Sequence, residues 1–196
     1  MLRTVSLIEI IINVIFIHDS EILNRFKHVS NFIRYKAEDV FLSFNGGKDC
    51  TVVLHLVATF ARLRNLDLPM CLYVSGDAFP EVRLQYLKSD IYLNYKVQII
   101  VTDEESILQV EEFVRSAAVY YGFELIYREG PIRDALAAVL EQRPNLKACL
   151  LGTRKGDPGA HSLERFTLTD PGWPKLMRVC PILHWSYSQV KLLYDL

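Results

Sequence analysis

The sequence predicts an α/β fold in which a parallel β-sheet is covered by helices on both faces. Short apolar runs of strand length alternate with longer segments whose apolar residues recur at helical spacing, a pattern typical of parallel sheets with helical crossovers. A glycine turn, Asn45-Gly46-Gly47, joins one such strand to one such helix. The 196 residues are 51% hydrophobic and contain no repeat or Ser/Gly linker, so we expect one domain with a substantial core.

The elements follow in order along the chain. A helix is predicted over residues 20–35, where Ile22, Phe26, Val29 and Ile33 recur at helical spacing. Strands are then predicted over residues 40–44, 70–75, 97–101, 123–127 and 147–152, and helices over residues 48–64, 111–121 and 131–142. Residues 153–185 show no periodicity and are rich in proline and glycine, so a long loop is predicted there. Loops of this length inside compact domains are usually functional.

Composition excludes several classes of protein. The formal net charge of −1 gives no general field that would attract nucleic acid or a membrane surface. The four cysteines are widely spaced without a CxxC pair, which predicts neither a zinc site nor a disulfide framework but reduced thiols. Glu9 and Asn13 interrupt the apolar N-terminal run, which favours a packed element over a signal or anchor. We therefore expect a cytoplasmic monomer, with a mitochondrial form as the alternative, that binds neither nucleic acid nor membrane.

The glycine turn has the chemistry of an anion site. In parallel sheets, ligands bind beyond the carboxyl ends of strands, where helix N-termini also point. Glycines allow close backbone approach and positive φ, and a helix N-terminus carries about half a positive charge. Lys48 adds a full charge, and Asn45 and Thr51 can donate hydrogen bonds. A Walker A loop is excluded because Leu42 stands where its first glycine should, and Asp49 follows the lysine.

Two motifs carry a family resemblance. Residues 45–51, NGGKDCT, resemble the pyrophosphate loop SGGxD[ST] of the adenine-nucleotide alpha-hydrolase superfamily, which implies a three-layer fold that binds ATP and cleaves it at the α-phosphate. GTRKGDP at 152–158 and TDPGWPKLMRVCPILHWSY at 169–187, with FPE at 79–81, closely resemble the FMN adenylyltransferase domain of the eukaryotic FAD synthase family. The likeness covers residues 38–82 and 111–191 and implies transfer of AMP from ATP to FMN, giving FAD and pyrophosphate, with Mg²⁺ as the cofactor.

The resemblance also implies roles for individual residues. Asn45, Lys48 and Asp49 are expected to be catalytic, with Asp49 also holding Mg²⁺. The expected ATP and pyrophosphate site consists of Ser43, Asn45, Gly46, Gly47, Lys48, Asp49, Cys50 and Thr51. The expected flavin site consists of Gly152, Arg154, Asp157, Asp170, Trp173 and Arg178.

Simpler structural interpretations remain open for some of these residues. One such interpretation of Asp49 is an acidic residue that stabilises the first turn of a helix without binding a ligand. Trp173 can fill a gap between the loop and the core, and Arg178 can form a structural ion pair with Asp170. Cys50 stands near a predicted helix N-terminus, where a thiol pKa is often lowered.

The chain departs from the family in three places. Residues 83–110 have no counterpart and are interpreted as an insertion, residues 1–30 match nothing in the family, and the chain ends at Leu196 before a family segment that carries arginines. We therefore retain a catalytically incomplete flavin- or nucleotide-binding isoform as an alternative. A reductase of the phosphoadenosine phosphosulfate type is a further alternative, although it would need a reactive cysteine, and Cys180 lies inside the flavin-like motif.

Overall fold

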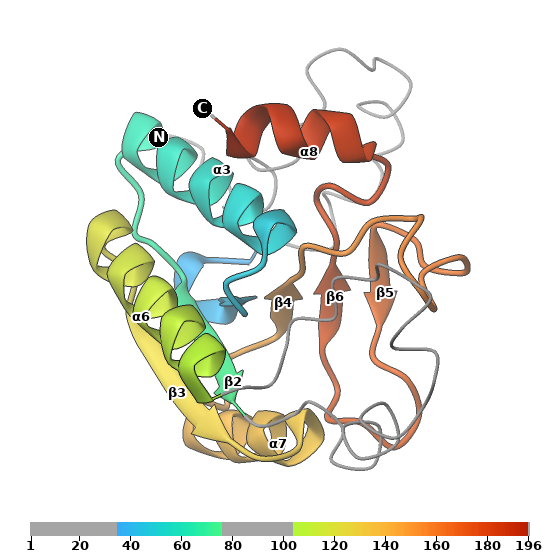
Figure 1. The fold of residues 1–196 in the computed structure, drawn as a ribbon. Helices are drawn as coiled ribbons and strands as arrows, with labels where there is room; N and C mark the ends of the chain where they lie inside the picture. Colours follow the sequence, from blue (N-terminus) through green and yellow to red (C-terminus); the bar gives the residue numbers. More distant parts are fainter. Residues whose placement is uncertain (1–34, 76–103, 196) are drawn as a thin grey trace, which may run out of the picture.

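The computed structural model describes residues 35–75 and 104–195, which form a six-stranded sheet with helices on both faces (Figure 1). The strands are β1 (Val40–Ser43), β2 (Met70–Ser75), β3 (Leu125–Glu129), β4 (Ala148–Leu150), β5 (Phe166–Leu168) and β6 (Met177–Val179). The helices are the short 3₁₀ helix η1 (Ala37–Asp39), α3 (Lys48–Arg64), α6 (Glu104–Tyr121), α7 (Ile132–Gln142) and α8 (Tyr187–Tyr194). The predicted α/β class is confirmed.

The strand order, β3-β2-β1-β4-β6-β5, places the first strand in the middle of the sheet. Phe41 of β1 lies opposite Met70 of β2 on one side and Cys149 of β4 on the other, and both pairings are parallel. From β1 the chain builds outward through β2 and β3 and then returns to add β4 on the opposite side. The order therefore reverses between β1 and β4, and such a switch point is where open α/β sheets bind ligands.

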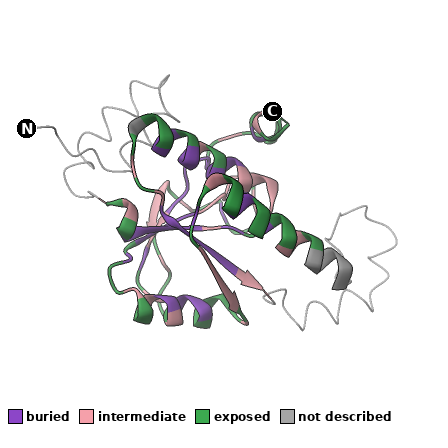
Figure 2. Ribbon diagram, turned by 90° about the vertical axis from the view of Figure 1, so that its left-hand side faces the viewer, coloured by how far each residue is buried: buried purple, intermediate pink, exposed green. Residues whose placement is uncertain are grey.

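Two hydrophobic clusters fill the spaces between the layers, because alternate residues of each strand face opposite sides of the sheet. Val40 and Leu42 of β1 pack in the cluster formed with α3 and α6, whereas Phe41 packs with Leu136 and Val139 of α7. Figure 2 shows the consequence, with the buried residues lying along the strands and on the inward faces of the helices. The predicted three-layer arrangement is confirmed.

The predicted loop over residues 153–185 was partly wrong, because it contains β5 and β6. These strands have three residues each, which is too short for a period-two pattern to stand out among the prolines and glycines. β5 also runs antiparallel to β6, so the sheet is parallel except at this edge. β6 pairs in parallel with β4 and carries the loop residues back beside the switch point.

The other predicted elements within the described residues are present, but β3 begins two residues later than predicted, at Leu125, and α8 was not predicted. The helix expected at 111–121 begins earlier, at Glu104, so residues 104–110 of the segment interpreted as an insertion belong to α6. The predicted helix at 20–35, apart from its last residue, and the predicted strand at 97–101 lie outside the described residues.

Candidate functional site

The turn between β1 and α3 forms the floor of the site. Gly46 has a φ of 77°, and an ideal Cβ on it would lie 3.2 Å from carbons of both Val110 and Val114, so α6 supports the turn from behind. Gly47 is the N-cap of α3 and has no side chain with which to cap it. The first backbone N–H groups of a helix have no intrahelical partners, so this end of α3 offers donors and partial positive charge at the carboxyl edge of the sheet.

Asn45 fixes the shape of the turn through its side-chain oxygen. Its Oδ1 accepts hydrogen bonds from the Gly47 N–H at 3.0 Å and from Cys50 Sγ at 2.8 Å. Thr51 Oγ1 donates to the Gly47 carbonyl oxygen at 2.9 Å, so in this structure the hydroxyl stabilises the helix start instead of pointing to a ligand. The Gly47 N–H and the Thr51 hydroxyl are thus used in hydrogen bonds within the turn. The groups left to bind an anion are the Lys48 side chain and the backbone N–H groups that follow it.

The pKa of Cys50 is raised and not lowered, although the thiol stands near a helix N-terminus. Burial raises the pKa of this thiol to about 11, and the favourable effect of the backbone around the turn does not overcome desolvation. The thiol is therefore neutral at neutral pH and acts as a hydrogen-bond donor within the turn.

Opposite charges alternate beside the turn. Lys48 Nζ lies 3.8 Å from Asp49 Oδ2, and Asp49 Oδ1 lies 3.0 Å from Arg154 Nε. Arg154 Nη2 lies 3.2 Å from Asp157 Oδ1, and the Arg154 backbone N–H donates to the other Asp157 oxygen at 2.7 Å. The side chain of Arg154 is only 17% exposed, so it is held between two carboxylates at the edge of the glycine turn.

The charges around Asp49 determine whether Mg²⁺ can bind at this carboxylate. Asp49 Oδ1 and Arg154 Nε are both buried without a well-aligned hydrogen bond, even though the atoms are close. The Arg154 guanidinium therefore stands at this oxygen, and a metal ion bound there would take the place of that ion pair. Across residues 35–75 and 104–195 no group of three or more His, Cys, Asp or Glu side chains forms a complete metal site. Mg²⁺ usually binds through one or two carboxylates plus substrate phosphates, and Asp49 fits that requirement.

Gly152 closes this part of the site from the side of β4. An ideal Cβ at this position would lie 2.6 Å from the Cys50 backbone nitrogen and 2.8 Å from the Asp49 carbonyl carbon, so only glycine allows the strand end to pack on the first turn of α3. A cavity of about 290 Å³ lies here, called the polar cavity below. It is lined by Ser43, Asn45, Gly47, Asp49, Cys50, Leu151, Gly152, Thr153 and Asp157.

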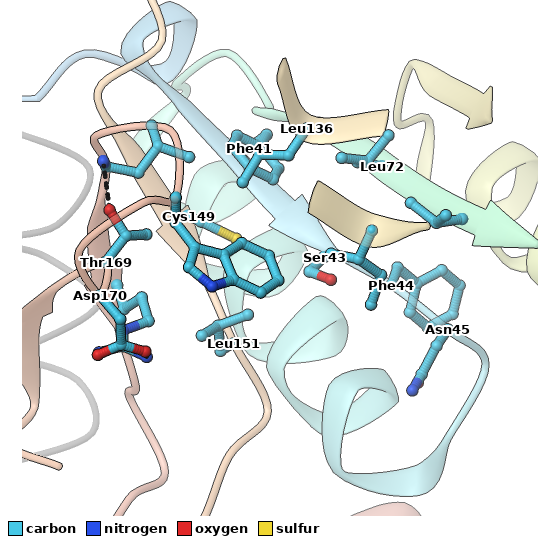
Figure 3. Close-up of a pocket in the computed structure, with 15 residues that line it drawn as sticks. Phe41, Ser43, Phe44, Asn45, Leu72, Leu136, Cys149, Leu151, Thr169 and Asp170 are labelled. Atoms are coloured by element: carbon cyan, nitrogen blue, oxygen red, sulfur yellow. Dashed lines mark hydrogen bonds and ion pairs between the residues drawn. The ribbon is translucent and has the colours of Figure 1, made fainter. Parts of the chain in front are cut away.

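A second cavity of about 300 Å³ adjoins the first and is called the apolar cavity (Figure 3). Its lining is mostly hydrophobic and comes from β1, β2, β4, α7 and the β5–β6 hairpin, and consists of Phe41, Ser43, Phe44, Asn45, Leu72, Val74, Ile132, Leu136, Cys149, Leu151, Thr169, Asp170, Trp173, Leu176 and Arg178. Ser43, Asn45 and Leu151 line both cavities, so the two share a boundary at the end of β1 and β4.

Polar groups lie at the rim of the apolar cavity. Arg178 donates from Nη1 and Nη2 to the two carboxylate oxygens of Asp170, at 3.2 and 3.1 Å. Its Nε is buried and makes no hydrogen bond within the described residues. Trp173 is 40% exposed, so its indole is not a fully buried plug of the core.

The structure divides the residues predicted for the flavin site into two groups. Gly152 and Asp157 line the polar cavity and Arg154 lies against Asp49, whereas Asp170, Trp173 and Arg178 line the apolar cavity. The sequence analysis missed the hydrophobic lining, of which Phe44 and Leu151 stand next to strand ends. It also missed Tyr187, whose ring lies against Lys48, because nothing in a local pattern reports the packing of α8 on α3.

Comparison with known proteins identifies the family. A family model described as the phosphoadenosine phosphosulfate reductase domain matches residues 39–195. The chain belongs to the phosphoadenosine phosphosulfate reductase domain family. The match begins just before β1 and ends after α8, so this family domain contains every element that lines the two cavities.

Within the phosphoadenosine phosphosulfate reductase domain family, the chain is similar to proteins named as FAD synthases. It is 34% identical over 158 residues to a probable FAD synthase of Caenorhabditis briggsae, covering 80% of this chain and 25% of that protein. It is 32% identical over 161 residues to one of Schizosaccharomyces pombe, covering 81% of this chain and 52% of that protein. The chain thus spans between about a quarter and about half of the length of these relatives.

A solved structure shares the fold of the family domain described here. The crystal structure of Candida glabrata FMN adenylyltransferase in complex with FAD and inorganic pyrophosphate matches with a TM-score of 0.62 and 21% identity, covering 98% of this chain and 59% of that one. At this identity the likeness supports the fold alone. Separately, no helix in the described part of the chain is both long and apolar enough to cross a bilayer.

Proposed function

We propose that this chain is an FMN adenylyltransferase module that transfers AMP from ATP to FMN, giving FAD and pyrophosphate. The observation that carries the proposal is the shared boundary of the two cavities at Ser43, Asn45 and Leu151. One cavity is lined by the glycine turn and adjoins the cations Lys48 and Arg154, which a polyphosphate needs, and the other has the hydrophobic walls that a fused ring needs. A reaction that joins a nucleotide phosphate to a flavin phosphate requires two such sites side by side. The relatives named FAD synthase support the same assignment.

The polar cavity would hold the departing pyrophosphate. The amides at the start of α3 and the ammonium of Lys48 meet the β- and γ-phosphates of ATP, while Asn45 keeps the turn in shape for them. Arg154 can exchange one of its carboxylate partners for a phosphate oxygen because guanidinium groups bind both bidentately. Asp49 would hold Mg²⁺, which when bound supplies charge neutralisation on the phosphates.

The apolar cavity would hold the isoalloxazine ring of FMN. Trp173 provides an aromatic wall, and the Arg178 guanidinium is part of the same lining. Asp170 keeps the Arg178 guanidinium in place through two hydrogen bonds. A structural ion pair between Arg178 and Asp170 is therefore compatible with binding, since a guanidinium that is held by an ion pair also presents a fixed group.

In the reaction, a terminal phosphate oxygen of FMN attacks the α-phosphorus of ATP. The new bond joins that oxygen to the α-phosphorus, and the bond from the α-phosphorus to the oxygen that bridges to the β-phosphate breaks, releasing pyrophosphate. The chain supplies positioning and positive charge, and no covalent intermediate is needed. A reductase chemistry based on a thiolate is disfavoured because all four cysteines are buried, and burial raises the pKa of Cys180 to about 11.

The test is formation of product by the purified full chain incubated with FMN, ATP and Mg²⁺, with FAD and pyrophosphate measured by chromatography. Equal amounts of the two products are expected, and none without FMN. A second variant should lack residues 83–103 only, because residues 104–110 belong to α6 and Val110 contacts the glycine turn. Binding of both substrates without product in both proteins would overturn the enzymatic proposal and leave the catalytically incomplete binding module.

The proposal includes the setting in which the chain acts. The four buried cysteines are free, which fits a reducing compartment such as the cytoplasm. We propose that the module acts there as a monomer. Sedimentation of the purified chain at working concentration measures that state directly.

A further inference from the structure

Tyr187, the first residue of α8, contacts Lys48 and Arg154, the two cations paired with the carboxylates Asp49 and Asp157 that line the polar cavity. Lys48 Nζ lies 4.7 Å from the centroid of its ring, and the guanidinium carbon of Arg154 lies 6.0 Å from the same centroid. Both distances are within the range of about 6 Å over which an aromatic face attracts a cation. The two cations come from opposite sides of the switch point, after β1 and after β4, and the ring of Tyr187 is a contact that they share.

The position of the ring is fixed by the helix that carries it. Ser186 caps α8, accepting a hydrogen bond from the Gln189 N–H at 3.2 Å, while the Gln189 side chain accepts from the Ser186 N–H at 2.7 Å. Val190 is fully buried in the cluster that includes α3. The ring itself is 54% exposed, so it stands at the surface but on an anchored backbone.

Lys48 is held less firmly than Arg154, which lies between two carboxylates. Lysine and arginine side chains lose rotamer freedom when they are ordered. Lys48 is 35% exposed, and its nearest carboxylate partner, Asp49, is 3.8 Å away, which is too far for a strong hydrogen bond. Asp49 is also shared with Arg154. A ring face attracts a cation without using up its hydrogen-bond donors, so the donors stay available for phosphate oxygens.

We propose that Tyr187 is a positioning residue that orders Lys48 and Arg154 toward the pyrophosphate of the reaction. The role rests on the proposed function, and it makes α8 part of the phosphate site. The aromatic face, and not the hydroxyl, performs it. Tyr187→Leu therefore weakens binding of inorganic pyrophosphate by about 10-fold, whereas Tyr187→Phe changes it by less than about 2-fold. Affinity for riboflavin, which has the ring but no phosphate, is unchanged in both variants.

The experiment compares the wild-type chain with Tyr187→Leu, Tyr187→Phe and Tyr194→Leu. Tyr194 ends the same helix and is 45% exposed, so Tyr194→Leu is a matched control for the loss of an exposed tyrosine from α8. Titration calorimetry measures pyrophosphate and riboflavin affinities in the presence of Mg²⁺. Proton NMR of the ligand-free chains measures the ring-current shift of the Lys48 side-chain protons, which is expected in the wild type and in the Phe and control variants but not in Tyr187→Leu.

The outcomes separate this inference from the proposed function. Equal pyrophosphate affinity in the wild type and Tyr187→Leu, or no ring-current shift at Lys48 in the wild type, would overturn the positioning role even if the chain makes FAD. An equal loss in Tyr187→Phe and Tyr187→Leu would overturn it too, because the hydroxyl would then be responsible. If the variants show the expected differences in pyrophosphate affinity but the wild-type chain forms no FAD, the proposed reaction is wrong and the role of Tyr187 in binding pyrophosphate is supported.

Discussion

The two cavities have nearly the same volume, about 290 and about 300 Å³, but they are built in different ways. The polar cavity is lined by residues from just two short stretches, 43–50 and 151–157, which follow the adjacent strands β1 and β4. The apolar cavity takes its lining from five separate parts of the fold, among them α7 and the β5–β6 hairpin. The first depends on backbone geometry, and the second depends on how distant side chains pack.

This difference predicts how each cavity responds to change. In the polar cavity the close packing at Gly152 is of main chain against main chain, which leaves no room for a side chain. In the apolar cavity many side chains share the contact with a ligand, so removing one of them weakens binding by a limited amount. Substitutions in the two regions should therefore differ in size and also in which ligand they affect.

The largest effect is expected for Gly152→Ala. Its new Cβ would meet three backbone atoms of Asp49 and Cys50 at 2.6 to 2.9 Å, and backbone cannot move aside as a side chain can. The free energy of unfolding should fall by about 3 kcal/mol, and pyrophosphate affinity should fall more than about 10-fold because the start of α3 is displaced. Urea unfolding and calorimetry measure the two effects.

Gly156→Ala is the matched control for that change. It lies four residues further along the same loop, and an ideal Cβ there meets no heavy atom within 4 Å. Its unfolding free energy should stay within about 0.5 kcal/mol of the wild type. Similar losses in the two variants would mean that the close approach of β4 to α3 does not determine the polar cavity.

A smaller effect is expected from the titration of Cys50. The ordinary pKa of its thiol is 9.0, and burial raises it to about 11 in the folded chain. Above pH 9 the unfolded chain therefore loses this proton while the folded chain keeps it, so the free energy of unfolding falls as pH rises from 9 to 11, by roughly 2 kcal/mol from this group. Below pH 9 the contribution is fully present.

Cys50→Ser removes the titration but keeps a hydrogen-bond donor for Asn45 Oδ1. The serine variant should show a shallower loss of stability between pH 9 and 11 than the wild type, as measured by urea unfolding at fixed pH values. Cys180→Ser should make the slope shallower in the same way, since burial also raises that pKa to about 11. Identical pH slopes in the wild type and Cys50→Ser would show that the Cys50 thiol does not remain protonated in the folded chain.

The contrast between a polar cavity built from two short stretches and an apolar cavity built from distant elements also explains which features the sequence predicted. β1, α3 and the turn between them were predicted nearly to the residue, because a buried strand, a glycine turn and a helix leave local patterns in consecutive residues. The charged residues of the loop after β4 could be named only from the resemblance to FAD synthases. Their grouping around Asp49 follows from the parallel pairing of β1 with β4, which no local pattern reports.

The apolar cavity was beyond local analysis for a physical reason. Phe41, Leu72 and Leu136 are ordinary core residues in sequence, and they line a cavity only because β1, β2 and α7 leave space at one edge. Strands β5 and β6 have three residues each, and their pairing on the far side of β4 is a tertiary contact. Tyr187 is a similar case, because its contact with Lys48 exists only through the packing of α8 on α3.

The smallest effects are expected from one substitution beside each cavity. They test the difference between the two cavities most sharply, because each substitution should weaken the binding of only one ligand. Lys48→Ala removes a charge from the glycine turn and should weaken pyrophosphate binding by about 10-fold with riboflavin binding unchanged. Trp173→Ala removes an aromatic wall of the apolar cavity and should do the reverse, weakening riboflavin binding by about 10-fold with pyrophosphate binding unchanged. Calorimetry with each ligand on each variant gives the four affinities.

The two cavities share Ser43, Asn45 and Leu151, so a double variant also reports whether they communicate. Lys48 and Trp173 have no common interaction partner in the contacts described above, and losses at such independent sites usually add. Lys48→Ala combined with Trp173→Ala should therefore weaken pyrophosphate binding no more than Lys48→Ala does alone, and riboflavin binding no more than Trp173→Ala does alone. If either single variant weakens both ligands equally, the division into a phosphate cavity and a ring cavity is wrong, and the cleft acts as one site.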